Sequence, residues 1–168
     1  VEEGTLCKEM QGLALKNCSV RMIDRKTGKI KYSDFGELLF THFCLSGPVI
    51  LSASAHMQDM DQVSYSVLID LKPALDEKKL DLRLQREFAE HRNRQFSNAL
   101  GALLPQKMIP VIAKCSGIDP ATRCNEITRQ QRMDLRRLLK GFEIPVGGFR
   151  PLSEAIITSG GVMIKEID

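Results

Sequence analysis

The stretch that decides the fold is GELLFTHFCLSGPVIL, residues 36–51. Its apolar run over residues 37–41 predicts a buried strand. The Ser46-Gly47-Pro48 turn then predicts a change to helix, because proline is well tolerated at the first helical position. A second stretch, EAIITSGGVMIKEID at residues 154–168, also joins an apolar run to a glycine turn. Since this run continues to the last residue, we expect the chain to be a piece of a longer protein.

The segments around residues 36–51 read as short antiparallel strands. On the N-terminal side, imperfect alternation over residues 13–24 predicts a half-buried strand with a bulge near Asn17-Cys18. A glycine-containing hairpin turn follows at residues 25–28. The remaining elements expected on the two sides are a short return strand at 29–32, a second turn at 33–36, a helix from Pro48 to about Ala55 and a strand at 63–71.

From residue 73 the pattern becomes helical. A helix is expected to begin between Pro105 and Pro110 and to run to about Cys115, and Thr128 begins a capping box for a helix that stops at Gly141. Strands return at 142–149 and near Ile156 and Val162. The sequence therefore predicts an α+β fold: a small β-barrel-like, antiparallel part at residues 1–72 plus 141–168, with an inserted helical subdomain at residues 73–140.

Composition narrows the class of protein. Apolar residues make up 43% of the 168 residues and charged residues 27%, which is ordinary for a globular domain. No run approaches the roughly 20 apolar residues of a membrane helix, and the N-terminus shows no secretory signal. The five cysteines include no CxxC pair, so we expect reduced thiols, no metal site and a cytoplasmic protein.

The chain contains neither GxGxxG nor GxxxxGK[ST], so it does not predict a nucleotide site of its own. Gly147-Gly148 is interpreted as a tight bend.

Two alternatives arise from reactive or charged side chains. His42 could act as a base for Cys44 or Ser46, although no carboxylate at a telling spacing orients it. Basic residues of the helical segment could bind nucleic acid if they faced one way, although a solvated helix face is the more common meaning of such charge. These basic residues are Arg83, Arg86, His91, Arg92, Arg94, Arg129, Arg132, Arg136, Arg137 and Lys140.

The quoted stretches resemble a flavoprotein family. Residues 36–51 are similar to its GE-x-LFTH-x-GLSGPAIL segment, residues 154–168 to EAIVTAGGVSLKEVD, and residues 11–20 to its G-x-SLKNVSV opening. The family is that of the BaiN/RdsA-type NAD(P)/FAD-dependent oxidoreductases, also called YhiN-like or aminoacetone-oxidase-like. Cys44 stands where this family usually carries glycine.

The resemblance implies that the chain is the insertion domain of such an enzyme, set between two halves of an FAD-binding Rossmann domain. It implies FAD, NAD(P)H and a small-molecule substrate in the parent protein, with no FAD expected on this piece alone, no catalytic residues in it and no membrane partner. It also implies that the chain helps to cover the flavin and substrate. The residues expected to approach the cofactor are Thr158, Gly160 and Gly161, followed by Thr41, His42, Ser46 and Gly47. A basic helical module that binds nucleic acid or a protein is the alternative.

Overall fold

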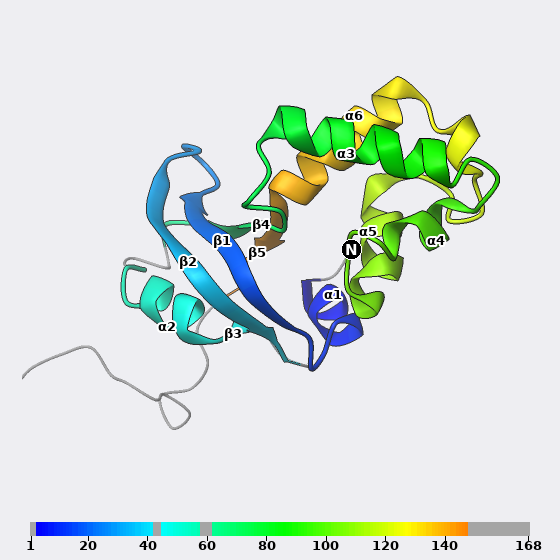
Figure 1. Cartoon of the computed structure of the whole chain (residues 1–168). Helices are drawn as coiled ribbons and strands as arrows, with labels where there is room; N and C mark the ends of the chain where they lie inside the picture. The colour runs from blue at the N-terminus through cyan, green and yellow to red at the C-terminus, as the bar shows by residue number, and fades with distance from the viewer. Residues whose placement is uncertain (1–2, 42–44, 58–61, 148–168) are drawn as a thin grey trace, which may run out of the picture.

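A computed structural model describes residues 3–41, 45–57 and 62–147 (Figure 1). The predicted strands at 148–149, 156 and 162 lie outside these residues.

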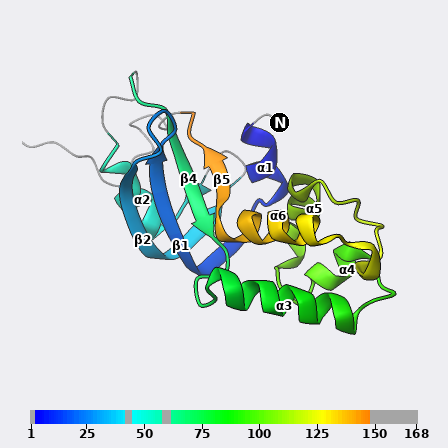
Figure 2. The same cartoon turned by 90° about the horizontal axis from the view of Figure 1, so that it is seen from above.

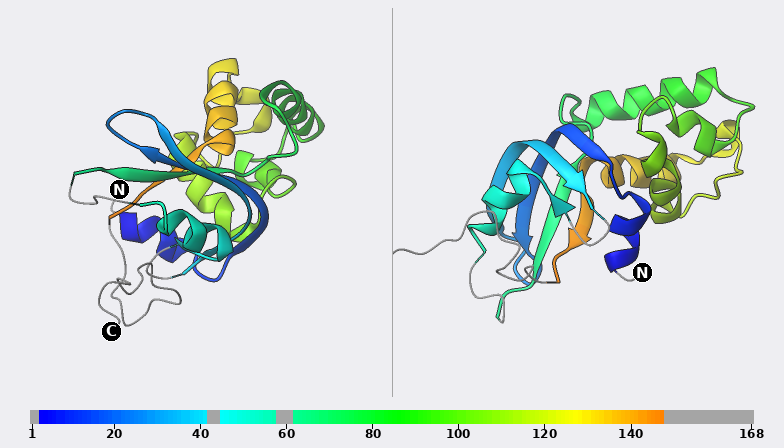
Figure 3. Two further views of the ribbon diagram at one scale, coloured as in Figure 1. Left: turned by 90° about the vertical axis from the view of Figure 1, so that its left-hand side faces the viewer. Right: turned by 90° about the horizontal axis from the view of Figure 1, so that it is seen from below.

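A five-stranded antiparallel sheet forms one part of the molecule. Its strands run in the order β3-β2-β1-β4-β5, and the sheet curls into a half-barrel, as Figure 3 shows. The strands are β1 (Ala14–Asp24), β2 (Ile30–Phe40), β3 (Leu45–Ser46), β4 (Tyr65–Asp70) and β5 (Phe142–Pro145). Because β4 and β5 pair directly, the chain leaves the sheet at Asp70, forms its helices, and returns to the neighbouring position at Phe142.

The helices fall into two sets. The set between β4 and β5 lies beside the sheet (Figure 2) and consists of α3 (Glu77–Glu90), α4 (Phe96–Leu100), the 3-10 turn η1 (Gln106–Met108), α5 (Ile109–Ser116), the 3-10 turn η2 (Cys124–Glu126) and α6 (Arg129–Lys140). The other two are α1 (Glu3–Glu9), which the sequence did not predict, and α2 (Pro48–Ser54). The expected α+β fold with a barrel-like part is confirmed.

The local start and stop signals are confirmed where they could be tested. Pro48 occupies the first turn of α2. Thr128 accepts a hydrogen bond from the Gln131 amide while the Gln131 side chain accepts one from the Thr128 amide, which completes the capping box of α6. Gly141 caps the end of α6. These signals act within four residues, so the surrounding fold does not override them.

One prediction for the sheet is wrong. We expected a short return strand and then a turn at residues 33–36, but β2 runs without a break from Ile30 to Phe40. Ser33 and Asp34 pair with Arg21 and Val20 of β1, so these polar residues sit inside the ladder. The turn-forming composition of the segment is overridden by eleven residues of pairing with a long neighbouring strand.

The predicted bulge is present in β1. Leu15 pairs with Leu38 and Cys18 pairs with Gly36, so β1 has one extra residue at Lys16-Asn17. The buried Cys18 thiol donates to the Gly36 carbonyl, with the sulfur 3.4 Å from the oxygen. This contact fixes the bulge against β2.

One large core joins the sheet to the helices, and a second, smaller cluster contains Met22, Ala53 and Tyr65. Fully buried side chains from the sheet meet fully buried leucines from α3 and α6 in one apolar cluster. Examples are Val20, Ile69, Leu80, Leu84, Leu135, Leu139 and Phe142. Within the described ranges, no helix is long and apolar enough to cross a membrane.

Candidate nucleic-acid interface

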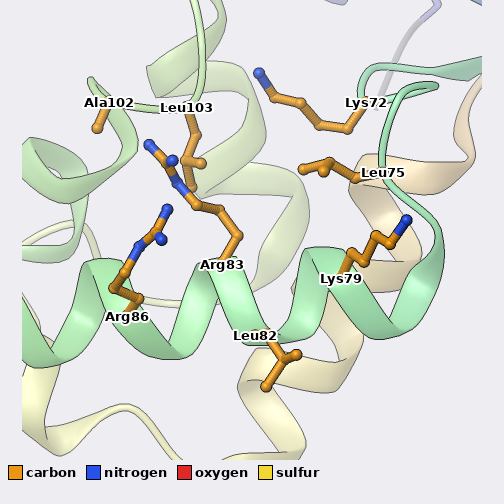
Figure 4. A pocket seen from close by; sticks show the side chains of 8 residues that line it. All are labelled: Lys72, Leu75, Lys79, Leu82, Arg83, Arg86, Ala102 and Leu103. Atoms are coloured by element: carbon orange, nitrogen blue, oxygen red, sulfur yellow. The ribbon is translucent and has the colours of Figure 1, made fainter.

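A cavity of about 490 Å³ opens beside α3 (Figure 4). One wall is α3 itself, and the others are the turn between β4 and α3 and the segment that follows α4. Four of the eight lining residues carry positive charge, and the other four are apolar. The lining consists of Lys72, Lys79, Arg83, Arg86, Leu75, Leu82, Ala102 and Leu103.

Three of these cations lie on one face of α3. Lys79, Arg83 and Arg86 stand at positions i, i+4 and i+7 of α3, so their side chains leave one face of the helix. Figure 4 shows Arg83 and Arg86 rising from α3 towards residues 102–103, with Lys72 across the cavity. Of the acidic residues of α3, Asp81 accepts from Arg132 of α6 at 3.0 Å. Nζ of Lys79 lies 3.9 Å from Oδ2 of Asp76, the residue that caps the start of α3, and both side chains are exposed.

Arg83 is held in place by a buried carboxylate. Its Nη2 lies 2.7 Å from Oε1 of Glu87, whose side chain is only 6% exposed. Oε2 of Glu87 lies 3.7 Å from Nε2 of His91. The Arg83 Nε is buried and has no hydrogen-bond partner within the described residues. Arg83 is thus oriented by Glu87 but keeps unused donor capacity.

Lys72 adds a second constrained cation. Burial, and then repulsion from the Arg83 guanidinium, lower the pKa of the Lys72 ammonium below its usual value. Two positive charges therefore face each other across a partly buried space. An anion between them would relieve the repulsion and replace lost hydration.

Hydrogen bonds from Lys140 and to Asp70 hold the backbone around Lys72. Nζ of Lys140 donates to the carbonyl oxygens of Lys72 at 3.1 Å and Leu75 at 2.6 Å. The Lys72 amide donates to Oδ1 of Asp70 at 2.9 Å. The turn that carries Lys72 is therefore tied to the end of α6.

The basic residues predicted from sequence do not form one stripe. Those of α6 are mostly used in ion pairs: Arg132 with Asp81, Arg136 with Glu77, Arg137 with Asp134 and Lys140 with Asp70. Arg83 and Arg86 instead line the α3 cavity. Sequence reasoning missed Lys72 and Lys79. The i, i+4, i+7 spacing of Lys79 with the two arginines was a signal for one of them, whereas Lys72 had no local signal.

Of the residues expected near a flavin, the structure describes Thr41, Ser46 and Gly47, and none of these three lines the α3 cavity. Thr41 follows β2, and Ser46 of β3 pairs with Leu39. Gly47 has a φ of 101°, and a Cβ there would lie 2.9 Å from the Glu37 carbonyl oxygen. His42, Cys44, Thr158, Gly160 and Gly161 lie outside the described residues.

The packing of α2 on β2 accounts for both glycines of the 36–51 stretch. A Cβ at Gly36 would lie 2.8 Å from Cγ2 of Val49, so α2 can approach β2 only over glycine. The Cβ position of Gly47 is likewise filled by the β2 backbone. The strand–glycine–helix unit β3–Gly47–α2 belongs to an antiparallel sheet, unlike the parallel βαβ unit that holds FAD pyrophosphate. The described residues therefore do not fit FAD on their own.

Glu87, Glu90 and His91 bring their ligand atoms within 4.8 Å of one another. Within this group, Oε1 of Glu87 pairs with Arg83 and Oε2 lies 3.7 Å from Nε2 of His91.

Comparison with known proteins agrees with this architecture. Residues 1–157 match the model of the family described as HI0933-like protein barrel and H2TH domain. The chain is also 28% identical over 130 residues to the ribosomal RNA dihydrouridine synthase of Escherichia coli (strain K12). The aligned residues cover 77% of this chain and 30% of that protein. The chain thus spans about a third of that relative's length. The chain belongs to the HI0933-like family of barrel and H2TH domains, within the HI0933/BaiN/RdsA-like FAD-dependent oxidoreductases.

Proposed function

We propose that this chain is the substrate-side domain of an FAD-dependent oxidoreductase that acts on RNA, and that it binds the RNA backbone in the α3 cavity. The observation that carries the proposal is the set of four cations, Lys72, Lys79, Arg83 and Arg86, around one cavity of a domain with a net charge of only +3. The domain is not catalytic by itself. It orients the substrate for chemistry that FAD supplies in the complete protein.

The chemistry of the cavity suits phosphodiesters. Guanidinium groups give directed, charge-assisted hydrogen bonds to phosphate oxygens, and lysine adds a compact charge. Arg83 is already oriented by Glu87, so less side-chain freedom is lost when it binds an anion. The apolar residues Leu75 and Leu103 give the sugar and base a surface to contact.

The relative supports the choice of RNA over a small molecule. Its name assigns it a reaction on ribosomal RNA, and the sequence similarity covers 77% of this chain. The nucleic-acid alternative and the insertion-domain interpretation then describe one protein: an insert that covers the flavin site and presents RNA to it. Lys72 and Arg86 have no ion-pair partner among the described residues, so they are the cations of the cavity that a phosphate would best complement.

Contacts with the flavin side remain part of the proposal. We assign them to Thr41, His42, Ser46, Gly47, Thr158, Gly160 and Gly161, with the Rossmann domain of the parent as partner and NAD(P)H as reductant. Gly47 would contribute backbone atoms only, because a positive φ and the nearby Glu37 carbonyl exclude a side chain. The proposed division is residues 1–72 plus 141–168 for the barrel-like part and 73–140 for the helices.

Binding of single-stranded RNA tests the proposal. Fluorescence anisotropy with a labelled RNA of about 12 nucleotides is measured between about 50 and 200 mM salt. Lys79→Gln/Arg86→Gln removes two exposed cations of the cavity without disturbing the Arg83–Glu87 pair. This variant should bind several-fold more weakly, and its salt slope should fall by roughly 1.4, about 0.7 for each lost phosphate contact.

The matched control is Arg129→Gln/Arg137→Gln, which removes the same charge from exposed positions on α6. It should change the affinity much less. Equal weakening in the two variants would show only a general charge effect, and an absence of RNA binding at the lowest salt would overturn the proposed function.

A further inference from the structure

A second cavity, of about 230 Å³, adjoins the first and shares Lys72 with it. Both cavities have one wall from residues 71–75 and another from residues 102–105. The far end of the second cavity is the β1 bulge. Its lining consists of Ala14, Leu15, Lys16, Asn17, Cys18, Leu71, Lys72 and Pro105.

The bulge brings a polar pair to this end. Lys16 and Asn17 are the residues without a regular partner in β2, and both are exposed. A bulge redirects side chains that a regular strand would place on alternate faces. The Cys18 thiol donates a hydrogen bond to the Gly36 carbonyl and so holds β1 against β2 next to Lys16 and Asn17. The Asn17 amide is therefore presented from a rigid backbone.

The order of chemical groups along the two cavities matches a polynucleotide. The α3 cations line the first cavity, Lys72 lines both, and Asn17 and Lys16 line the second beside apolar Leu15, Leu71 and Pro105. An asparagine amide carries both donors and an acceptor, which is what hydrogen bonding to a base edge requires. Apolar side chains suit the faces of a base.

We propose that single-stranded RNA lies across both cavities, with a phosphate at Lys72 and an unpaired base in the bulge cavity, where Asn17 contacts its edge. The inference rests on the proposed RNA-binding function and goes further, because it specifies an unpaired strand and a residue that contacts a base. In an A-form duplex the Watson–Crick edges are already paired and the major groove is too narrow for side chains. A duplex offers only minor-groove edges to a side chain and therefore cannot place an unpaired base in the bulge cavity.

The test uses the 168-residue chain and fluorescence anisotropy on single-stranded RNAs of about eight nucleotides, of adenine, cytosine, uracil and mixed sequence, together with a duplex of about 12 base pairs. The wild-type chain should bind the single strands at least about tenfold more tightly than the duplex. Lys72→Met should weaken binding to every single strand and lower the salt slope by about 0.7. Asn17→Ala should change the order of preference among the single strands and leave the slope unchanged.

Asn93→Ala, at an exposed position after α3, is the matched control and should change neither quantity. Lys72→Gln replaces Lys72→Met if the latter fails to fold, which circular dichroism reports. A photocrosslink from 4-thiouridine RNA should also map to residues 14–18.

The outcomes separate the two proposals. If the wild-type chain binds no RNA, the proposed function fails and this inference fails with it. If RNA binds and depends on Lys79 and Arg86, but duplex and single strand bind equally and Asn17→Ala behaves like Asn93→Ala, then the function stands and the single-strand inference is overturned.

Discussion

Nζ of Lys140 lies 2.7 Å from Oδ2 of Asp70, which joins the last residue of α6 to the last residue of β4. The two side chains are only 18% and 14% exposed. The same ammonium also donates to the carbonyls of Lys72 and Leu75. One lysine thus fixes the turn that carries Lys72 into both cavities.

Replacing Lys140 by methionine should therefore destabilise the protein and weaken RNA binding together. The change removes the ammonium from Oδ2 of Asp70 and from the two carbonyls, although Asp70 keeps the bond from the Lys72 amide. We expect a loss of about 2–4 kcal/mol in the free energy of unfolding, measured by urea denaturation. Lys114→Met is the control, because the Lys114–Glu9 pair is 3.8 Å long and well exposed. Its effect should stay below about 1 kcal/mol. Equal losses in the two variants would contradict the proposed role of Lys140.

Gly47→Ala should be more damaging than a positive φ alone explains. The residue has a φ of 101° and no room for a Cβ beside the Glu37 carbonyl, so strain and overlap add to about 2–5 kcal/mol. Gly117 has a φ of 71° with open space around it, so Gly117→Ala should cost only about 1–2 kcal/mol. Thermal and urea unfolding of both variants measure the difference. A Gly47→Ala protein as stable as the Gly117→Ala protein would show that α2 can move away from β2.

The thiol of Cys18 should be strongly protected from alkylation. Burial, and next the charge of Asp70, raise the pKa of Cys18 to about 11, against 9.0 for an unperturbed thiol. Its thiolate fraction near pH 8 is therefore about a hundredfold lower than that of the unfolded chain. Iodoacetamide labelling followed by mass spectrometry, with and without urea, measures this ratio for each cysteine. The exposed Cys115 should react well before Cys18 in the folded protein, and a Cys18 that reacts as fast as Cys115 would contradict the packing of the bulge.

The hairpin between β1 and β2 should lose stability in acid. Bonds from the Thr27 hydroxyl and then the Lys26 amide lower the pKa of Asp24. Because the folded pKa lies below the unfolded value of 3.8, the contribution of ionised Asp24 is fully present above that value and is lost as the pH falls through the folded pKa. The stability gap between wild type and Asp24→Asn, from urea midpoints between pH 7 and pH 2, should close in acid.

Thr27→Val is the control for that experiment. Thr27→Val removes the largest cause of the lowered Asp24 pKa. The stability difference between Thr27→Val and the double variant Thr27→Val/Asp24→Asn should therefore begin to close at a higher pH than the difference between wild type and Asp24→Asn. A gap that stays constant with pH would mean that the Asp24 charge does not hold the turn.

Local sequence determined the elements whose signals lie within a few residues. The start of α2 at Pro48 and the capping box at Thr128 depend on residues that are close neighbours in the chain, so the sequence alone predicts them. The bulge expected near Asn17-Cys18 lies at Lys16-Asn17 and is held by the distant Gly36 carbonyl. The motif at residues 36–51 also predicted the family from a short stretch of sequence. Its glycines then proved to serve the contact between β2 and α2.

Tertiary structure decided which charges meet. Lys72 precedes α3 and comes to face Arg83 only because α3 packs beside the turn, and Lys140 reaches that turn from 68 residues away. The same packing pairs Arg132 with Asp81 and so removes it from any basic stripe. The sequence shows the sign and spacing of charges along a helix. Whether a charged side chain is paired or free to bind a ligand depends on which element packs against it. Burial of the apolar core determines which elements pack together.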